Sequence, residues 1–570
     1  MIQNPILPGF CPDPSIIRVG NDYYIANSSF EWWPGVKIYH SKDLKHYEQL
    51  PSPLNRLSQL NMIGEGDSCG VWAPDISWNG EYFWLIYTDV KTRTGGLFNT
   101  HNYLVKSKDI RGGWSEPVYL NSSGFDPSVF HDTDGKMYIV NMINNFKGIL
   151  VQEYDPVQEC LVGEAKNVFP GTGSGYTEGP HIYHIGEYYY LLMAEGGTGY
   201  DHMVTMARAK SIWGPYEEDP GNPVLTSDIE NPDELQRCGH ADIVCTQNGE
   251  WYMVHLCSRP PMGSRQCVLG RETAIQKMVW NEEGWLRMAC GGNFGQWETE
   301  EPEGLAEYTF PEEAEKDYGR DEFDIESVAH GKCSGDFEDN TGKNRCVESG
   351  LNSAEGDDKL EKDKLVASDY LDVRYTALRQ PYDSYTSLTE RPGYLRLYGQ
   401  ESLNSCYNVS LVARRQMERH VQVETCVEFT PTCREQMAGL AYMYDTGNFY
   451  LLVKTRDEEF GNQTLDLKSP AKLRLIKSDH FDVTDVVQEI SIPEETPLFL
   501  RVVTTQEGLY AKFFYSLDGK EYKELAELPT KILTDEQSDG FTGAHFGMYC
   551  HDMTGLRRYA DFDYFEMKLC

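Results

Sequence analysis

The run Glu178-Gly179-Pro180-His181-Ile182-Tyr183, within the longer segment from Tyr176 to Leu192, belongs to a structural unit that the chain uses five times. A carboxyl residue precedes a short β-type run, and the turn Ile185-Gly186-Glu187 connects this run to an aromatic strand. The other four units begin at Pro14-Ser15-Ile16, Pro74-Asp75-Ile76, Pro127-Ser128-Val129 and Ala241-Asp242-Ile243. Five copies of one hairpin indicate a protein built from radial repeats.

The alignment of the units gives the period of the repeat. When Ile16, Ile76, Val129, Ile182 and Ile243 are superposed, the steps between them are 60, 53, 53 and 61 residues. A period of about 50 to 60 residues with β hairpins is typical of a propeller. A later strand is marked in three units by the similar segments Ser41-Lys42-Asp43-Leu44, Ser107-Lys108-Asp109-Ile110 and Ala209-Lys210-Ser211-Ile212. We therefore predict an all-β fold that starts with a five-bladed β-propeller over residues 1–300.

The pattern changes after the fifth unit. Residues 301–324 are expected to form a surface linker, because the chain there is rich in Glu and Pro. Residues 325–364 are charged and nearly free of aromatic side chains, which predicts a mobile acidic insertion. Short alternating strands follow, at Tyr394–Tyr398, Val421–Val427, Phe449–Val453 and Ala511–Tyr515. We predict a β-sandwich domain over residues 325–570.

Composition limits the classes of partner. The formal net charge is −38 at pH 7, and the chain has no Gly-rich phosphate loop or basic aromatic patch, which argues against nucleic acid. The sequence lacks a long apolar run and a signal-peptide pattern, so we expect no membrane contact and a cytoplasmic location. The 15 cysteines are scattered, which is typical of reduced buried thiols. A homo-oligomer is compatible with the sequence.

One position of the repeat carries ionisable side chains. The residue before the shared Pro or Ala is Asp13, Ala73, Asp126, Gly179 or His240, and Glu178 stands one step earlier. Because the inner strands of a propeller surround one channel, these side chains are expected to converge on it. For a single Asp-Pro pair, a turn before a strand is the simpler interpretation. Three carboxyl groups in one pocket favour catalysis, and glycoside hydrolysis needs an acid together with a base or nucleophile.

The motifs around these carboxyl groups resemble those of glycoside hydrolase family 43, in its β-xylosidase branch. They are Asn4-Pro5, Gly9-Phe10-Cys11-Pro12-Asp13-Pro14-Ser15-Ile16, Ser29-Phe30-Glu31-Trp32, Trp72-Ala73-Pro74-Asp75, Gly124-Phe125-Asp126-Pro127-Ser128, Tyr176-Thr177-Glu178-Gly179-Pro180-His181, Cys238-Gly239-His240-Ala241 and Gly270-Arg271-Glu272-Thr273-Ala274. Further matches extend through Ala560-Asp561-Phe562-Asp563-Tyr564-Phe565, so the resemblance covers nearly the whole chain. The acidic segment 325–364 departs from the family pattern.

The resemblance implies roles for particular residues. It implies an inverting mechanism with Asp13 as general base, Glu178 as general acid and Asp126 as the group that raises the pKa of Glu178. It also implies substrate contacts, which would come from Phe30, Trp72, His240, Arg271 and Phe541. No cofactor and no dedicated metal ligands are expected, although some similar enzymes hold a cation such as calcium in the channel near His240.

The expected activity is that of an exo-1,4-β-xylosidase that releases xylose from the non-reducing ends of xylo-oligosaccharides, with α-L-arabinofuranosidase side activity. Two alternatives remain at this point. One is a dedicated α-L-arabinofuranosidase. The other is a non-catalytic carbohydrate-binding propeller, which would not need three carboxyl groups.

Overall fold

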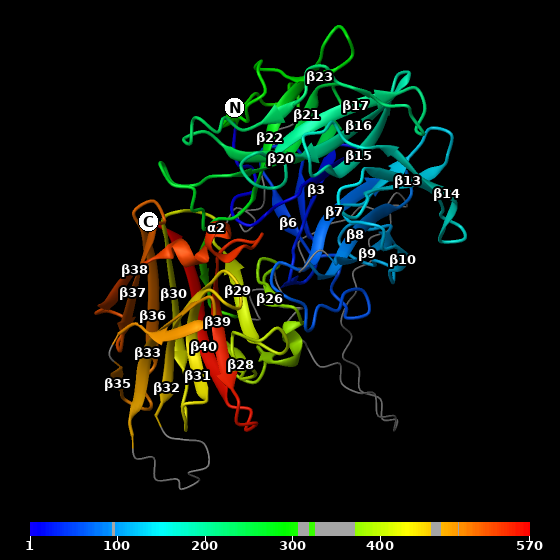
Figure 1. The fold of residues 1–570 in the computed structure, drawn as a ribbon. Coiled ribbons are helices and arrows are strands. Elements are labelled where there is room, and N and C mark those ends of the chain that lie inside the picture. The colour runs from blue at the N-terminus through cyan, green and yellow to red at the C-terminus, as the bar shows by residue number, and fades with distance from the viewer. Residues whose placement is uncertain (94–96, 306–317, 325–370, 458–468, 488) are drawn as a thin grey trace, which may run out of the picture.

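The computed structural model describes residues 1–93, 97–305, 318–324, 371–457, 469–487 and 489–570, which form two β-rich bodies (Figure 1). The predicted all-β fold is confirmed. The blue-to-green body at the upper right of Figure 1 contains five antiparallel sheets, each built from strands that follow one another in the chain. The predicted acidic insertion at 325–364 lies outside the described residues.

The five sheets are the blades of the propeller. Blade 1 contains β2 (Ser15–Val19), β3 (Asp22–Asn27), β5 (Lys37–Ser41) and β6 (Glu48–Leu50). Blade 2 contains β7 (Gly70–Trp78), β8 (Phe83–Thr92), β9 (Asn99–Ser107) and β10 (Val118–Asn121). Blade 3 contains β11 (Ser128–His131), β12 (Met137–Met142), β13 (Ile149–Asp155) and β14 (Cys160–Phe169). Blade 4 contains β15 (Glu178–Ile185), β16 (Tyr188–Glu195), β17 (Met203–Ala209), β18 (Glu217–Glu218) and β19 (Leu225–Thr226). Blade 5 contains β20 (Gln236–Cys245), β21 (Trp251–Ser258), β22 (Glu272–Trp280) and β23 (Leu286–Met288).

The first strands of the blades form a closed ring. β2 contacts β7, β7 contacts β11, β11 contacts β15, β15 contacts β20, and β20 returns to β2. The N-terminal segment joins the first and last blades, because Leu7 pairs with Thr273 of β22 and β1 (Ile2–Gln3) pairs with β24 (Glu298–Thr299). Five blades therefore surround one axis, as the repeat predicted.

The repeat position that carries the ionisable residues has an unusual backbone conformation in every blade. The φ angles are 51° at Asp13, 31° at Ala73, 50° at Asp126, 54° at Gly179 and 42° at His240. A positive φ is uncommon for residues other than glycine. Its occurrence at all five equivalent positions shows that each blade has the same backbone irregularity, which lies just before the first strand in blades 1 and 3 and within it, at a register shift, in blades 2 and 5.

The C-terminal body is a sandwich of two antiparallel sheets, shown in yellow to red in Figure 1. One sheet contains β25 (Gly319–Asp321), β27 (Thr386–Ser387), β28 (Leu395–Tyr398), β40 (Tyr559–Leu569), β30 (Val421–Glu428), β36 (Leu498–Thr505), β37 (Tyr510–Ser516) and β38 (Lys523–Pro529). The other contains β29 (Ser410–Arg415), β39 (His545–Asp552), β31 (Gln436–Met443), β32 (Phe449–Arg456), β33 (Ala471–Asp479), β34 (Asp482–Asp485) and β35 (Ile490–Ile492). The short helices are η3 (Tyr382–Ser384), η4 (Thr530–Leu533) and α2 (Asp535–Ser538). The strand β25 lies within the segment expected to be a linker.

The two bodies share strand pairing and an apolar core. β26 (Ala377–Leu378) pairs with β4 (Trp32–Trp33) of the propeller. One buried cluster combines propeller residues such as Trp33 and Leu60 with sandwich residues such as Tyr382 and Leu440. Burial of this kind stabilises the contact between the bodies by roughly 25 cal/mol per Å² of apolar surface.

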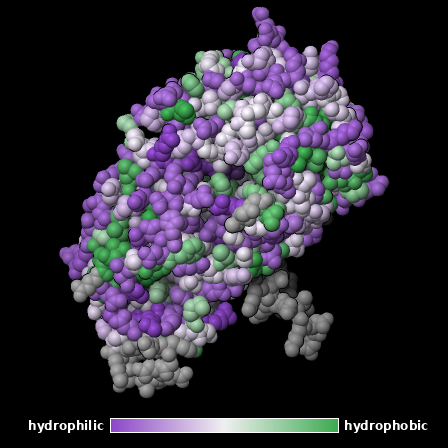
Figure 2. All heavy atoms as spheres, viewed as in Figure 1, coloured by the Kyte–Doolittle hydropathy of each residue, from purple (hydrophilic) through white to green (hydrophobic). Residues whose placement is uncertain are grey.

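Hydrophilic residues cover most of the face seen in Figure 2, and apolar residues form scattered groups on it. This distribution agrees with the net charge of −38. The cysteines in the described part of the chain are free thiols. No helix within the described ranges is long and apolar enough to span a membrane.

Candidate active site

A pocket of about 270 Å³ lies at the end of the propeller where the first strands begin. All eight residues selected from the sequence line it: Asp13, Phe30, Trp72, Asp126, Glu178, His240, Arg271 and Phe541. The pocket is near the lower end of the size range of small-molecule sites, which is roughly 300–1,000 Å³. Residues more than 500 positions apart in the chain therefore meet in one small cavity.

The wall of the pocket comes from equivalent loops. Phe30, Phe98, Phe146, Thr198 and Arg271 lie in the loops between the second and third strands of blades 1 to 5, in that order. Phe541 is the exception, because the sandwich domain contributes it from the loop after α2. Each blade thus provides one residue near the start of its first strand and one from this loop.

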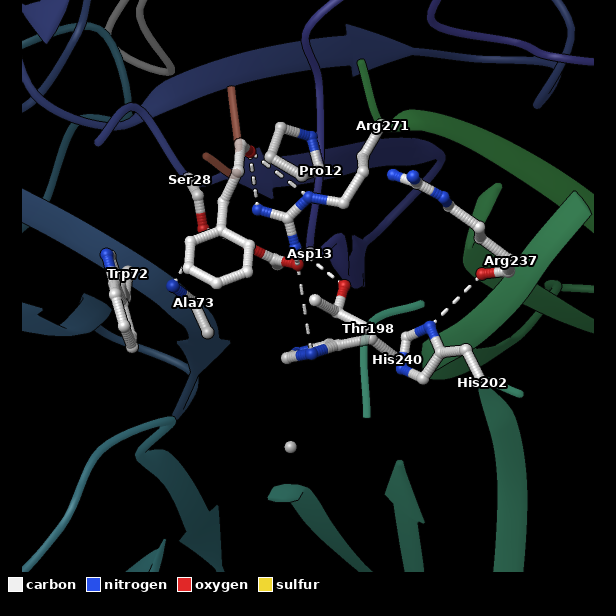
Figure 3. Close-up of polar contacts among 12 residues, drawn as sticks. Pro12, Asp13, Ser28, Trp72, Ala73, Thr198, His202, Arg237, His240 and Arg271 are labelled. Atoms are coloured by element: carbon white, nitrogen blue, oxygen red, sulfur yellow. Dashed lines mark hydrogen bonds and ion pairs between the residues drawn. The ribbon is translucent and has the colours of Figure 1, made fainter. Parts of the chain in front are cut away.

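Asp13 is held by three polar neighbours. Ser28 Oγ donates a hydrogen bond to Asp13 Oδ2 at 2.6 Å, and Arg271 Nη1 donates to Oδ1 at 3.1 Å. His240 Nδ1 lies 3.9 Å from Oδ1, so Asp13 is placed between Arg271 and His240 (Figure 3). Burial raises the pKa of Asp13, but the charge of Arg271, helped by the Ser28 hydrogen bond, outweighs burial and lowers the pKa below the usual 3.8. Asp13 is ionised at neutral pH, which is the state of a general base.

The pKa values of Asp126 and Glu178 are shifted in the opposite direction to that of Asp13. Burial is the largest cause that raises the pKa of both groups, and the negative charge of Asp13 adds to it. The pKa of Asp126 rises to about 8, and repulsion from Asp126 helps to raise that of Glu178 well above its usual 4.5. The two groups titrate as a pair, so Glu178 can retain a proton near neutral pH, as a general acid requires.

The backbone after Glu178 explains why this carboxyl group stands one residue before the shared repeat position. Gly179 occupies that position with φ of 54°, and a Cβ atom there would lie 3.0–3.2 Å from the His240 ring. The Gly179 N–H also donates a hydrogen bond to Asp126 Oδ2 at 3.2 Å. A side chain at position 179 would crowd His240, and the acid is supplied by the preceding residue.

The aromatic wall is organised around Trp72. Its ring lies 5.8 Å from Phe30, 5.4 Å from Phe125 and 6.1 Å from Phe541, measured between ring centroids. Trp72 Nε1 donates to the Ser68 carbonyl at 2.9 Å, so the indole has a fixed orientation. Phe30 is only 2% exposed, and it supports this wall more than it presents a free face to a ligand.

Arg271 connects the carboxyl groups with the sandwich domain. Its Nη2 and Nε donate to the Phe541 carbonyl at 2.8 and 3.2 Å, and its Nη1 also donates to Thr198 Oγ1 at 3.0 Å. One guanidinium therefore orients the Asp13 carboxylate and fixes the loop that carries Phe541. Burial lowers the pKa of His240 to about 4, so His240 is neutral at pH 7 and the charge beside Asp13 is that of Arg271.

Sequence reasoning missed several residues of the pocket, namely Arg93, Phe98, Phe125, Phe146, Tyr176, Gly197 and Thr198. Most lie in the loops between second and third strands, and the repeat alignment could have identified these loops as equivalent. It also missed Ser28, which links Asp13 to the backbone N–H of Ala73 at 2.7 Å.

A polar group lies on the axis next to His240. Asp75, His181 and Asp242 have candidate ligand atoms within 4.8 Å of one another, and a small cavity connects Asp75 and His181 with His240. Carboxylates and imidazole suit a divalent cation. Asp242 accepts hydrogen bonds from Ile16 N, Tyr183 OH and Ile243 N, and the single Ser15 hydroxyl proton is shared between Asp242 and Asp75. Asp75 accepts one further bond, from Val129 N, so it has more capacity than Asp242 to bind such an ion.

An ionised carboxylate and a protonated carboxylic acid that face one sugar-sized pocket are what glycosidic bond hydrolysis requires. The comparisons with known proteins place this chain in that class of enzyme. Glycosyl hydrolases family 43 matches residues 2–286, and the Beta xylosidase C-terminal Concanavalin A-like domain matches residues 367–568. The chain belongs to glycoside hydrolase family 43. The glycosidases of this family are cofactor-independent.

Similar proteins span the full length of the chain. A protein named Beta-xylosidase from Bacillus subtilis (strain 168) is 42% identical over 100% of this chain and 99% of its own. Xylosidase/arabinosidase 43B from Humicola insolens is 41% identical over 99% of this chain and 97% of its own. The crystal structure of xylan beta-1,4-xylosidase from Bacillus Halodurans C-125 matches with a TM-score of 0.86 at 43% identity and covers 100% of both chains.

Proposed function

We propose that the protein is an inverting exo-1,4-β-xylosidase that releases xylose from the non-reducing ends of xylo-oligosaccharides. Asp13 is the general base, Glu178 is the general acid, and Asp126 raises the pKa of Glu178. The observation that carries the proposal is the opposite direction of the pKa shifts at Asp13 and Glu178 within one pocket.

The proposed reaction is a single displacement. Asp13 accepts a proton from a water molecule while the oxygen of that water attacks the anomeric carbon. Glu178 donates its proton to the departing glycosidic oxygen. The water enters opposite the leaving group, so the configuration inverts. We expect the carboxyl groups of Asp13 and Glu178 to lie roughly 6.5–9.5 Å apart in a substrate complex, whereas a separation of about 5 Å would indicate retention.

The dimensions and the chemistry of the pocket support action at chain ends. Its volume of about 270 Å³ suits a terminal sugar better than an interior segment of a polymer. Phe541 contributes to its wall from the sandwich domain, and neutral His240 and Thr198 offer groups that can hydrogen-bond hydroxyls. The names and titles of full-length relatives at 42–43% identity support β-linked xylose as the substrate.

Product stereochemistry tests the proposal. When an aryl β-D-xyloside is hydrolysed in an NMR tube, the first xylose signal is expected to be that of the α anomer, followed by slow mutarotation. Initial release of β-xylose would contradict inversion. The first products from xylohexaose are expected to be xylose and xylopentaose only, so early release of xylobiose, xylotriose or xylotetraose would contradict the exo mode.

A second candidate is hydrolysis of α-L-arabinofuranosides. It is favoured by the Humicola insolens relative, whose name covers both activities. The ratio of kcat/KM on aryl β-D-xyloside and aryl α-L-arabinofuranoside decides which activity dominates. We expect the xyloside to be preferred and the arabinofuranoside to react at a lower rate.

A further inference from the structure

A cluster of charged side chains lies outside the pocket, next to the segments that carry three of its wall residues, Thr198, His240 and Phe541. Arg237 precedes His240 by three residues on β20, Tyr200 follows Thr198 by two residues, and α2 precedes the Phe541 loop. We define the Arg237 cluster as Arg237, Asp535, Glu536, Tyr200 and Tyr444. None of these five residues lines the pocket.

The centre of the cluster is an ion pair between the two domains. Arg237 Nη1 lies 2.5 Å from Asp535 Oδ2, and Nη2 contacts Glu536 Oε1. The side chains of Arg237 and Asp535 are 7% and 8% exposed, and that of Glu536 is 23% exposed. A forked contact between one buried guanidinium and two carboxylates is directional, so it restricts α2 in both position and orientation.

The cluster extends to the Phe541 loop through Tyr444. This buried tyrosine donates its OH to Asp535 and accepts a hydrogen bond from the N–H of Thr542 at 3.0 Å. A Cβ atom at Gly540 would lie 2.6 Å from the Tyr444 ring, so the loop rests directly on this side chain. The residues on both sides of Phe541 are therefore tied to the same tyrosine.

The cluster also extends to the loops of the propeller. The Arg237 guanidinium lies over the Tyr200 ring at 5.0 Å, and Tyr200 OH hydrogen-bonds to Glu536 Oε1 at 3.3 Å. The Arg237 carbonyl hydrogen-bonds to His202 Nδ1 at 3.1 Å, as Figure 3 shows beside Asp13 and Arg271. The loop with Thr198 and the strand with His240 are thus bound to the same ion pair as the Phe541 loop.

We propose that Arg237, with Asp535 and Glu536, is a positioning group for the pocket. It holds the walls that carry Thr198, His240 and Phe541 at the spacing that fits the terminal sugar, and it does so without touching the sugar. This inference rests on the proposed glycosidase function. Displacement of these walls should weaken substrate binding more than it slows the chemical step, because Asp13, Asp126 and Glu178 come from other strand ends.

The test variants must not leave a buried charge without its partner, because removal of one member of a buried ion pair is strongly destabilising by itself. The triple substitution Arg237→Met, Asp535→Asn and Glu536→Gln removes all three charges with little change in shape. Arg237→Lys keeps the positive charge but cannot form the forked contact with both carboxylates. The matched control is Glu418→Gln, which breaks the ion pair between Arg259 and Glu418 across the same domain interface, away from the pocket.

Steady-state kinetics on an aryl xyloside provide the first measurement. For the triple variant we expect KM to rise on the order of 10-fold and kcat to change by less than about 3-fold, with an intermediate KM for Arg237→Lys and a wild-type KM for Glu418→Gln. An unchanged KM in a folded triple variant would overturn the positioning role. An equal rise of KM in Glu418→Gln would also overturn it, because general loosening of the interface would then be the cause.

Hydrogen exchange provides a measurement that does not depend on the substrate. Phe541 N–H and Thr542 N–H are bonded to Ser68 Oγ and Tyr444 OH, so both amides should exchange slowly in the wild type. The triple variant should exchange them at least about 10-fold faster, while Glu418→Gln should not. If the wild type hydrolysed no xyloside, the proposed function would fail, and unchanged exchange in the triple variant would separately refute the positioning role.

Discussion

Asp13 and Glu178 carry the same functional group in one pocket, and their neighbours shift the two pKa values in opposite directions. Arg271 and Ser28 bond to Asp13. No side chain among the described residues hydrogen-bonds to the Glu178 carboxyl, and its burial, followed by the negative charges of Asp126 and Asp13, outweighs the effect of Arg271 and raises its pKa. The local electrostatics thus agree with the base and acid roles that the family resemblance implies.

The roles of these two residues can be separated by the leaving group. Asp13→Ala removes water activation, so we expect a loss on the order of 10²–10⁴-fold on every substrate. Glu178→Ala removes protonation of the leaving oxygen, so the loss should be severe on xylobiose and much milder on an activated aryl xyloside. Measurement of kcat/KM for both variants on both substrates tests the assignment of base and acid. Equal losses on the two substrates for both variants would contradict the assignment.

We expect Asp126 to influence the alkaline side of the pH profile. Asp126→Asn removes a like charge beside Glu178, so the pKa of Glu178 should fall and the active protonated acid should be lost at a lower pH. The alkaline limb of kcat/KM is therefore expected to move to lower pH while part of the activity persists. Asp134→Asn, on an exposed turn of the same blade, should leave the profile unchanged. A shift of the alkaline limb to higher pH would contradict the proposed role.

At the scale of elements, the segment before β15 is held by the end of β16. Glu195 is fully buried, and its carboxylate accepts hydrogen bonds from Thr172 N at 2.9 Å and Thr177 Oγ1 at 2.7 Å, as well as from Thr172 Oγ1. This segment contains Tyr176 of the pocket wall and leads directly to Glu178. The second strand of blade 4 therefore positions the start of the first strand.

Loss of this anchor should reduce activity without removing any group from the pocket. For Glu195→Ala we expect kcat/KM to fall on the order of 10- to 100-fold on xylobiose and by a smaller factor on an activated aryl xyloside, because Glu178 is displaced together with the wall and its proton matters less for a good leaving group. Glu187→Ala removes an exposed carboxylate of the same hairpin and serves as the control. Wild-type kinetics for a folded Glu195→Ala protein would show that the segment is held by its other contacts.

At the scale of the whole molecule, the propeller depends on the sandwich domain in two ways. The sandwich supplies Phe541 to the pocket, and it covers apolar propeller residues such as Trp33 and Leu60. A chain truncated after Leu305 would expose this surface and lose one wall of the site. We expect the truncated protein to be inactive or insoluble. A soluble propeller with full activity on xylobiose would refute this dependence.

The sequence determined the features that repeat locally. The hairpin units predicted five blades, and the common position of Asp13, Asp126 and His240 in these units predicted a shared pocket that also includes Glu178. Alternating strands likewise predicted the sandwich. These features were accessible because strand periodicity and turn residues act over a few positions of the chain.

Other features depended on the tertiary structure. The contacts of Arg271 with Asp13, Thr198 and Phe541 join segments up to 270 residues apart, and the Arg237 cluster joins segments nearly 300 residues apart. The pKa difference between Asp13 and Glu178 arises from such contacts and from burial, neither of which leaves a local pattern in the sequence. The packing of the blades against the sandwich determines these contacts and the pKa difference. Electrostatic interactions depend on distance in space and on exclusion of water, not on separation along the chain.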